Sequence, residues 1–176
     1  VVTTPKNIVY YGGKSQQVEK NTRVKARVKA QALREIISGK ENVLIMGHRI
    51  PDVDSFGAAV GIYRVASTLG RQAHIVLNEV STSMKPMVDH FRHHQDYAEG
   101  QIVSNQQAME LAGSNTVLVV VDVNKPSITE CPELLRMCKS IVVLDHHRQG
   151  TESIENATLS YVEAYASSTC EMVSEI

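Results

Sequence analysis

Tryptophan is absent from this sequence, phenylalanine occurs only twice, and there is no long apolar run. A membrane-spanning helix needs roughly 18 or more consecutive apolar residues, and no stretch approaches that length. The first residues also lack the basic, apolar and small-residue order of a secretory signal peptide. We therefore expect the chain of 176 residues to be soluble.

Cysteine is scarce as well, because Cys131, Cys138 and Cys170 are odd in number and share no CxxC spacing. This argues against a disulfide framework and against a structural zinc site. We expect reduced, unreactive thiols in a cytoplasmic setting, since unpaired cysteine usually packs as a small apolar side chain. Neither GxxxxGK[ST] nor GxGxxG occurs, which argues against an NTPase with a phosphate-binding loop and against a nicotinamide enzyme.

The net charge of -1 conceals a basic segment near the N-terminus. Within residues 14–34 one acid, Glu19, stands against seven basic residues: Lys14, Lys20, Arg23, Lys25, Arg27, Lys29 and Arg34. The remainder of the chain therefore carries a net charge of -7. The same segment places four apolar residues near one face of a helix: Val24, Val28, Leu33 and Ile36.

This pattern predicts an amphipathic linker helix, residues 14–40, that docks on the domain through its apolar face and turns its basic side to solvent. Binding of a nucleic acid or an anionic membrane surface is the alternative. The segment lacks the aromatic residues that stack on bases, so we expect no DNA partner. Its apolar stripe could equally pair with a second copy, which leaves a homodimer open.

Residues 1–13 contain Ile8-Val9-Tyr10-Tyr11 followed by Gly12-Gly13, a pattern typical of a strand that ends in a turn. We expect this strand to have no partner within reach. Residues 1–13 are therefore interpreted as the tail of a preceding domain.

From residue 43 onward, strand and helix patterns alternate. We predict strands at 43–47, 73–77, 117–122 and 141–145, and helices at 55–69, within 83–112 and near 132–138. Gly70 marks a helix end, and Ser168-x-x-Glu171 marks the start of a last helix. Such alternation is typical of an α/β domain with a mostly parallel sheet flanked by helices, here residues 41–176.

Three of the apolar runs lead into residues of metal-binding types: His48, Asp52 and Asp54 after 43–47, Asp122 after 117–121, and Asp145, His146 and His147 after 141–144. Because the carboxyl ends of parallel strands meet at one edge of a sheet, we expect the three clusters to converge there. Carboxylates with imidazoles suit Mn²⁺ or a similar divalent ion, and no cysteine lies nearby to favour zinc. A two-metal hydrolytic site is the leading hypothesis.

Structural roles are the alternative for each cluster. Asp54 could cap the following helix while Asp52 fills a turn, and Asp122 could cap a turn toward Asn124. A carboxylate placed directly after five apolar residues is costly to bury unless a cation compensates its charge, which favours a metal-bridging Asp122. Two further residues are candidates for contacts with substrate phosphate: Ser55 at a helix start and Arg148 after the histidines.

The segments Gly47-His48-x-x-x-Asp52-x-Asp54-Ser55 and Asp145-His146-His147, with the isolated Asp122, resemble the motifs of the DHH phosphoesterase family. Residues 46–59, 10–13 and 19–27 resemble, more narrowly, the cyclic-di-AMP phosphodiesterases that join a PAS and a degenerate GGDEF domain to a DHH module. The resemblance implies a DHH first lobe behind a linker helix. It also implies upstream sensory domains and a membrane-anchored parent protein, with this module on the cytoplasmic side.

The resemblance further implies a set of residue roles. His48 and Asp52 would bind one Mn²⁺, Asp54 and His146 the other, and Asp122 would bridge the two. His147 would contact phosphate, and Asp145 would orient an imidazole rather than bind metal. Hydrolysis of the cyclic dinucleotide to linear pApA is the expected reaction, with two ions activating one water.

Family members supply a further metal-binding aspartate well after the DHH triplet and a second lobe with a Gly-rich substrate motif. No aspartate follows Asp145, and the second lobe would begin beyond Ile176, so we expect this chain alone to be weakly active or inactive. Three other readings stay open: a DHH phosphoesterase acting on short oligonucleotides or pAp, a manganese pyrophosphatase, and a non-catalytic module that senses a nucleotide.

Overall fold

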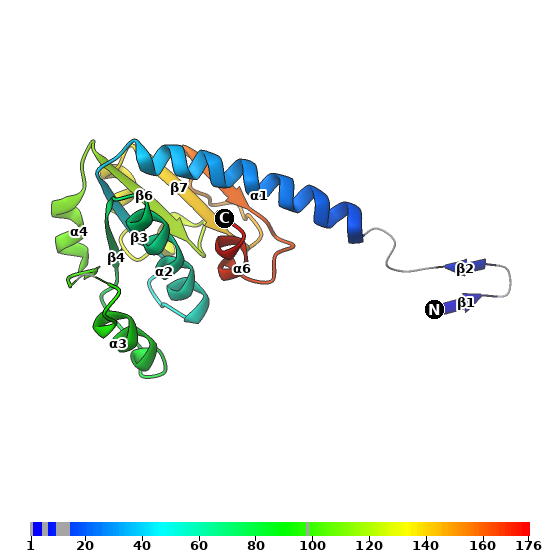
Figure 1. Cartoon of the computed structure of the whole chain (residues 1–176), viewed down its shortest axis with the longest axis horizontal. Coiled ribbons are helices and arrows are strands. Elements are labelled where there is room, and N and C mark those ends of the chain that lie inside the picture. Colours follow the sequence, from blue (N-terminus) through cyan, green and yellow to red (C-terminus); the bar gives the residue numbers. More distant parts are fainter. Residues whose placement is uncertain (1, 5–6, 10–14, 98) are drawn as a thin grey trace.

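The computed structural model describes residues 2–4, 7–9, 15–97 and 99–176, with side chains described from Val24 onward. A parallel sheet of six strands forms the centre of the domain, in the order β5-β4-β3-β6-β7-β8 (Figure 1). The strands are β3 (Asn42–Met46), β4 (Gln72–Val76), β5 (Ile102–Val103), β6 (Thr116–Val121), β7 (Ser140–Asp145) and β8 (Leu159–Val162). The predicted α/β domain with a mostly parallel sheet is confirmed.

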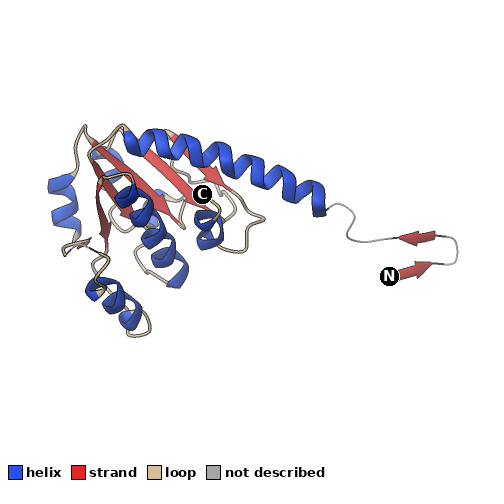
Figure 2. Cartoon of the chain, viewed as in Figure 1, coloured by secondary structure: helices blue, strands red, loops and turns tan. Residues whose placement is uncertain are grey.

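Helices cover both faces of this sheet (Figure 2). They are α1 (Ser15–Ser38), α2 (Val53–Thr68), α3 (Lys85–His93), α4 (Asn105–Leu111), α5 (Leu134–Met137) and α6 (Thr169–Ser174). Side chains of α1, α2, α3 and α6 share one hydrophobic core with the sheet, and those of α4 and α5 share the other.

Strand β6 shows why the apolar runs become buried strands. Its six residues are all buried. Val117, Val119 and Val121 point into the core beneath α1 and α2, whereas Leu118 and Val120 point into the core beneath α4 and α5. Successive side chains of a strand alternate between faces, so a strand covered on both sides needs an unbroken apolar run.

Helix α1 carries the basic segment, and its predicted apolar face is wrong for two residues. Val24 and Val28 are 61% and 63% exposed, whereas Ala26, Leu33 and Ile37 are buried. Val24 and Val28 each lie two positions from a residue on the buried side, which turns them roughly 200° around the helix from it. The stripe that docks is therefore set by Leu33 and Ile37.

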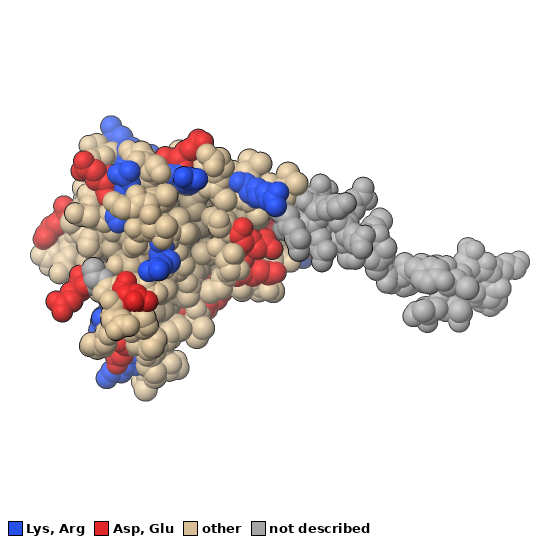
Figure 3. Space-filling view, in the orientation of Figure 1, with Lys and Arg blue, Asp and Glu red and all other residues tan. Residues whose placement is uncertain are grey.

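The basic side of α1 also makes contacts instead of only facing solvent. Lys29 Nζ donates a hydrogen bond of 3.0 Å to the Ser160 carbonyl, and Lys25 Nζ lies 3.9 Å from a carboxylate oxygen of Glu163. Acidic and basic side chains are interspersed over the described part of the face that Figure 3 shows. These contacts attach α1 to β8 and to the residue that follows it.

The strand predicted near the N-terminus does have a partner, contrary to our expectation. Strand β1 (Val2–Thr4) pairs antiparallel with β2 (Asn7–Val9). The prediction overlooked β1 because Val2-Thr3-Thr4 is too short to show a periodic pattern. The predicted turn at residues 10–13 lies outside the described residues.

Helix boundaries differ from the prediction by a few residues. Helix α2 begins at Val53, two residues before Ser55, and ends at Thr68 ahead of Gly70, whose φ of 69° suits glycine. Strands β5 and β8 were not predicted. Among the described residues, no helix combines the length and apolarity required to cross a bilayer.

Candidate metal centre

Strands β3, β6 and β7 are neighbours in the sheet, so their carboxyl ends lie at the same edge. His48 follows β3, Asp122 follows β6 and His146 follows β7. The Nε2 atoms of His48 and His146 each lie 3.5 Å from a carboxylate oxygen of Asp122. The structure therefore brings the three predicted clusters together at one edge.

Asp122 stands at the centre of this arrangement. Its φ of 61° lies in the left-handed region, where the structure describes no other non-glycine residue. Its N–H donates to the Leu144 carbonyl at 2.9 Å, which ties the strained turn to β7. The side chain is only 2% exposed, with Oδ2 toward His48 and Oδ1 toward His146. A conformation of this kind costs about 1–3 kcal/mol and is typical of functional sites.

His48 and Asp52 lie on one side of Asp122. Asp52 caps α2, since its Oδ1 accepts a 2.9 Å hydrogen bond from the Ser55 N–H, while its Oδ2 lies 3.7 Å from His48 Nε2. The capping role considered for Asp54 thus belongs to Asp52, and it leaves the second oxygen of Asp52 facing the site. The contact with Asp122 raises the pKa of His48, although burial opposes this shift.

Asp54 and His146 lie on the other side, 3.6 Å apart between Oδ2 and Nε2. The first residues of α6 hold the Asp54 carboxylate: the Thr169 N–H donates to Oδ2 at 2.9 Å and the Cys170 N–H to Oδ1 at 2.8 Å. Burial favours the neutral form of Asp54, but these hydrogen bonds outweigh it and lower the pKa. The sequence analysis missed both residues, and the only sign of them was the helix start at Ser168.

The expectation that no cysteine lies near the site is wrong in three dimensions. The Cys170 thiol donates to the backbone carbonyl of Asp54 at 3.2 Å. Burial, reinforced by Asp54, raises the pKa of this thiol to about 12. The metal-free protein therefore keeps this thiol protonated at neutral pH, with its proton donated to a backbone carbonyl.

Asp145 is a buried carboxylate with no exposed surface. Its Oδ1 accepts hydrogen bonds from His147 Nδ1 at 2.8 Å and from the His147 N–H at 3.2 Å. Its Oδ2 accepts from Asn124 Nδ2 at 2.5 Å. Asp145 thus contacts an imidazole and an amide, as the orienting role requires. Asn124 is a second residue that the sequence analysis did not select.

Two compact groups of ligand atoms result, and they share Asp122. His48, Asp52 and Asp122 form the first group, and Asp122, His146 and His147 form the second, with the atoms of each group within 4.8 Å of one another. His147 Nδ1 lies 3.7 Å from Asp122 but only 2.8 Å from Asp145. We therefore assign the Nδ1 proton to the bond with Asp145. Asp54, 3.6 Å from His146, is a further carboxylate beside the second group.

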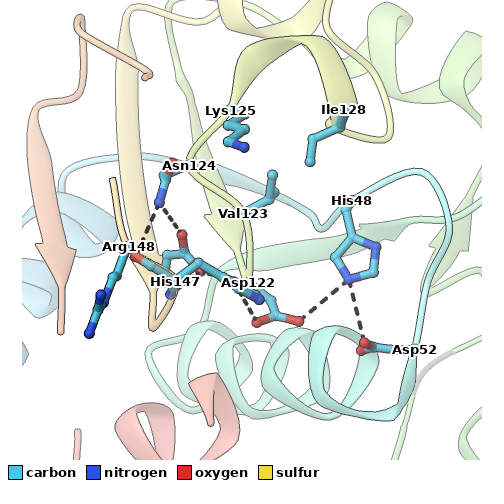
Figure 4. A pocket seen from close by; sticks show the side chains of 10 residues that line it. His48, Asp52, Asp122, Val123, Asn124, Lys125, Ile128, His147 and Arg148 are labelled. Carbon is cyan, nitrogen blue, oxygen red and sulfur yellow. Dashed lines mark hydrogen bonds and ion pairs between the residues drawn. The ribbon is translucent and has the colours of Figure 1, made fainter. Parts of the chain in front are cut away.

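A cavity of about 320 Å³ opens beside these residues (Figure 4). Its lining consists of His48, Asp52, Asp122, Val123, Asn124, Lys125, Ile128, Asp145, His147 and Arg148. Arg148, expected near phosphate, lies on this wall together with Lys125, which the sequence analysis did not select. An anionic substrate would meet two positive charges beside the carboxylate centre.

Ser55, the other candidate for phosphate, is not brought to this cavity. Its side chain is 3% exposed and lies against Gly47, where a Cβ atom would overlap Ser55 Oγ. Glycine at position 47 therefore lets the loop after β3 pass close to the first turn of α2.

The residues present fit a divalent cation. Among the described residues, the side chains that contact the Asp122 carboxylate are imidazoles and the Thr169 hydroxyl, none of which carries a permanent charge. A carboxylate this deeply buried is stabilised by a bound cation. Oxygen and imidazole donors without thiolate suit Mn²⁺ and similar ions.

Comparisons with known proteins agree with this geometry. The sequence model described as "DHH family, N-terminal domain" matches residues 42–176. The cyclic-di-AMP phosphodiesterase GdpP of Bacillus subtilis (strain 168) is 41% identical over 171 residues, covering 96% of this chain and 26% of GdpP. The cyclic-di-AMP phosphodiesterase PdeA of Listeria monocytogenes serotype 1/2a (strain 10403S) is 39% identical over 179 residues, covering 100% of this chain and 27% of PdeA. The chain spans about a quarter of the length of these relatives.

A solved structure shares the fold at lower sequence identity. It is that of an exopolyphosphatase-related protein from Bacteroides fragilis, which is 17% identical with a TM-score of 0.66. The match covers 84% of this chain and 42% of that protein.

Proposed function

Because the chain belongs to the DHH family, we propose that it is the metal-binding lobe of a manganese-dependent phosphodiesterase that hydrolyses cyclic-di-AMP to linear pApA. The single observation that carries this proposal is the buried Asp122, held at a φ of 61° between His48 and His146. The substrate is taken from the relatives GdpP and PdeA, which are cyclic-di-AMP phosphodiesterases by name.

In this proposal five residues would hold the cations: His48 and Asp52 one ion, Asp54 and His146 the other, with Asp122 shared by the two. Bound divalent ions of this type lower the pKa of a water molecule and stabilise negative charge at phosphorus. Asp122 can serve both ions because its two carboxylate oxygens face different imidazoles.

The substrate would lie in the cavity beside this centre. Asp145 accepts the Nδ1 proton of His147, so a second proton on the ring would sit on Nε2 and could be donated to a phosphate oxygen or to a departing oxygen. Arg148 and Lys125 supply positive charge on the same wall. Their guanidinium and ammonium groups would orient the phosphodiester and favour an anionic substrate over neutral competitors.

The organisation of the whole protein is also part of the proposal. Residues 1–13 would end a degenerate GGDEF-like domain, residues 14–40 would form the linker helix, and residues 41–176 would form the first DHH lobe. A second lobe, upstream sensory domains and a membrane anchor would complete the protein, which would work as a homodimer on the cytoplasmic side without a DNA partner. The relatives' length, about four times the matched part, leaves room for these domains.

The test is hydrolysis of cyclic-di-AMP and of pApA by this chain and by a form extended through the second lobe, each with Mn²⁺ or with a chelator. We expect manganese-dependent pApA production by the extended form, weak or no activity of the chain alone, and loss of activity in Asp122→Ala. Asp96→Ala, at a side chain 60% exposed outside the cavity, is the matched control.

Other outcomes identify the alternatives. Degradation of pApA without turnover of cyclic-di-AMP would favour a phosphoesterase of short oligonucleotides or pAp. Nucleotide binding without any turnover would favour a sensing module. Turnover with Mn²⁺ that survives Asp122→Ala would overturn the assigned centre.

A further inference from the structure

Helix α6 begins against the metal centre, although it follows the DHH motif by more than twenty residues. Thr169 makes two hydrogen bonds there: its N–H donates to Asp54 Oδ2 at 2.9 Å and its hydroxyl donates to Asp122 Oδ1 at 2.9 Å. Both carboxylates that face His146 are thus held by one residue. Thr169 itself has no exposed surface.

The Thr169 hydroxyl has a specific effect on the Asp122 carboxylate. It occupies one lone pair of Oδ1, the oxygen that faces His146, and it opposes rotation of the carboxylate plane. The other oxygen, Oδ2, faces His48 and is not among the acceptors of the α6 donors. The two halves of the centre therefore differ in their direct contacts, because the donors described at the start of α6 bind the Asp54 carboxylate and the Asp122 oxygen that faces His146.

We propose that Thr169 is a positioning residue that aligns Asp122 and Asp54 for the cation on the His146 side. The inference rests on the proposed function, since it concerns the second cation of that centre. Hydrogen bonds from outside the ligand set commonly contribute 10- to 100-fold to metal affinity. The hydroxyl, rather than the methyl group, is the part of Thr169 that does this.

Three variants separate positioning from packing. Thr169→Val keeps the shape and removes the hydroxyl, whereas Thr169→Ser keeps the hydroxyl and removes the methyl group. Thr116→Val is the matched control, because Thr116 is equally buried, at 1% exposure, and its hydroxyl donates to the Leu111 carbonyl at 2.9 Å, remote from the centre.

Each variant is titrated with Mn²⁺ alone, and free Mn²⁺ is followed by its electron paramagnetic resonance signal. We expect the wild-type chain to bind a tighter and a weaker ion, with magnetic coupling between them at saturation. Thr169→Val should weaken one of the two ions by about 10- to 100-fold and lose the coupling at equal Mn²⁺ concentration, with the other ion little changed. Thr169→Ser and Thr116→Val should both keep the wild-type isotherm.

Several results would overturn the inference. One is a Thr169→Val chain that binds both ions as the wild type does. Another is Thr169→Ser behaving like Thr169→Val, which would assign the effect to packing. A wild-type chain that binds a single ion would show that α6 does not prepare a second site, and one that binds no ion would overturn the proposed metal centre as well.

Discussion

The Nδ1 atom of His147 lies 2.8 Å from Oδ1 of Asp145, a carboxylate with no exposed surface. The backbone N–H of His147 donates to the same oxygen at 3.2 Å, so the residue is held at two points. A carboxylate that accepts from one ring nitrogen fixes both the tautomer and the orientation of the imidazole. His147 is therefore prepared to act through Nε2, while its neighbour His146 faces Asp54 and Asp122.

Replacing Asp145 with asparagine tests this orientation. We expect Asp145→Asn to lower kcat for cyclic-di-AMP in the extended protein by about 10- to 100-fold, because an amide can present a donor where His147 needs an acceptor. The KM should change less, since the charges of Arg148 and Lys125 remain. Steady-state kinetics measure both constants beside Asp96→Asn as a control. A wild-type kcat in Asp145→Asn would show that catalysis does not depend on the Asp145 carboxylate fixing the tautomer and orientation of His147.

Asn124 offers a test of stability. Its Nδ2 donates to Asp145 at 2.5 Å and the side chain is 4% exposed, so Asn124→Ala leaves a buried carboxylate oxygen without this donor. We expect a loss of about 1–3 kcal/mol in the free energy of unfolding, measured by urea denaturation. Asn156→Ala removes a weaker bond of 3.3 Å at an exposed position and should change stability by less than about 0.5 kcal/mol. Equal losses in the two variants would contradict the claim that the buried hydrogen bond of Asn124 contributes more to stability than the exposed one of Asn156.

The central strands and most of the candidate metal ligands could be predicted from the sequence. Unbroken runs such as Val117–Val121 can be buried on both faces only in a covered sheet, and a carboxylate directly after such a run has to lie at its carboxyl end. Because those ends share one edge, Asp122 and His146 could be placed together before any distance was known. The φ of Asp122 could not be foreseen, since the apolar run before it indicates only a strand and few non-glycine residues adopt the left-handed region.

The contacts of α6 could not be predicted because they join residues far apart in the sequence. Thr169 lies 47 positions after Asp122 and 115 after Asp54, and its own neighbourhood signals only a helix start. Strand β8 was missed for another reason. Its sequence Leu-Ser-Tyr-Val at the sheet edge has one buried residue, Tyr161, and therefore lacks the continuous apolar run of the central strands.

The cysteines lead to a prediction about reactivity. Burial raises the pKa of the Cys131 and Cys138 thiols, and that of Cys170 is raised to about 12. A raised thiol pKa means less thiolate at pH 8, and thiolate is the reactive form. We expect all three to react slowly with a disulfide reagent in the folded chain and rapidly in urea. One fast-reacting thiol in the absence of urea would contradict the packing described for it.

Gly47 gives the sharpest test of how the loop after β3 is built. In Gly47→Ala the new Cβ would overlap Ser55 Oγ and lie 3.3 Å from Ser55 Cβ and 3.4 Å from the Val121 carbonyl oxygen. We expect a loss of about 1–3 kcal/mol in the free energy of unfolding, because neither β6 nor the first turn of α2 can yield without disturbing the core. Gly113→Ala, where no atom lies within 4 Å of the added Cβ, should be neutral or stabilising by up to about 1 kcal/mol.

A double-mutant cycle with Ser55→Ala then identifies the clash. If the hydroxyl of Ser55 is the main obstacle, Ser55→Ala should recover most of the stability that Gly47→Ala loses, leaving only the tight contact between the two Cβ atoms. Strictly additive effects would mean that Gly47 is required for its backbone freedom instead. Mn²⁺ titration of the same variants adds a functional measure, since any shift of this loop moves His48 relative to Asp122 and should weaken the ion that these two residues share.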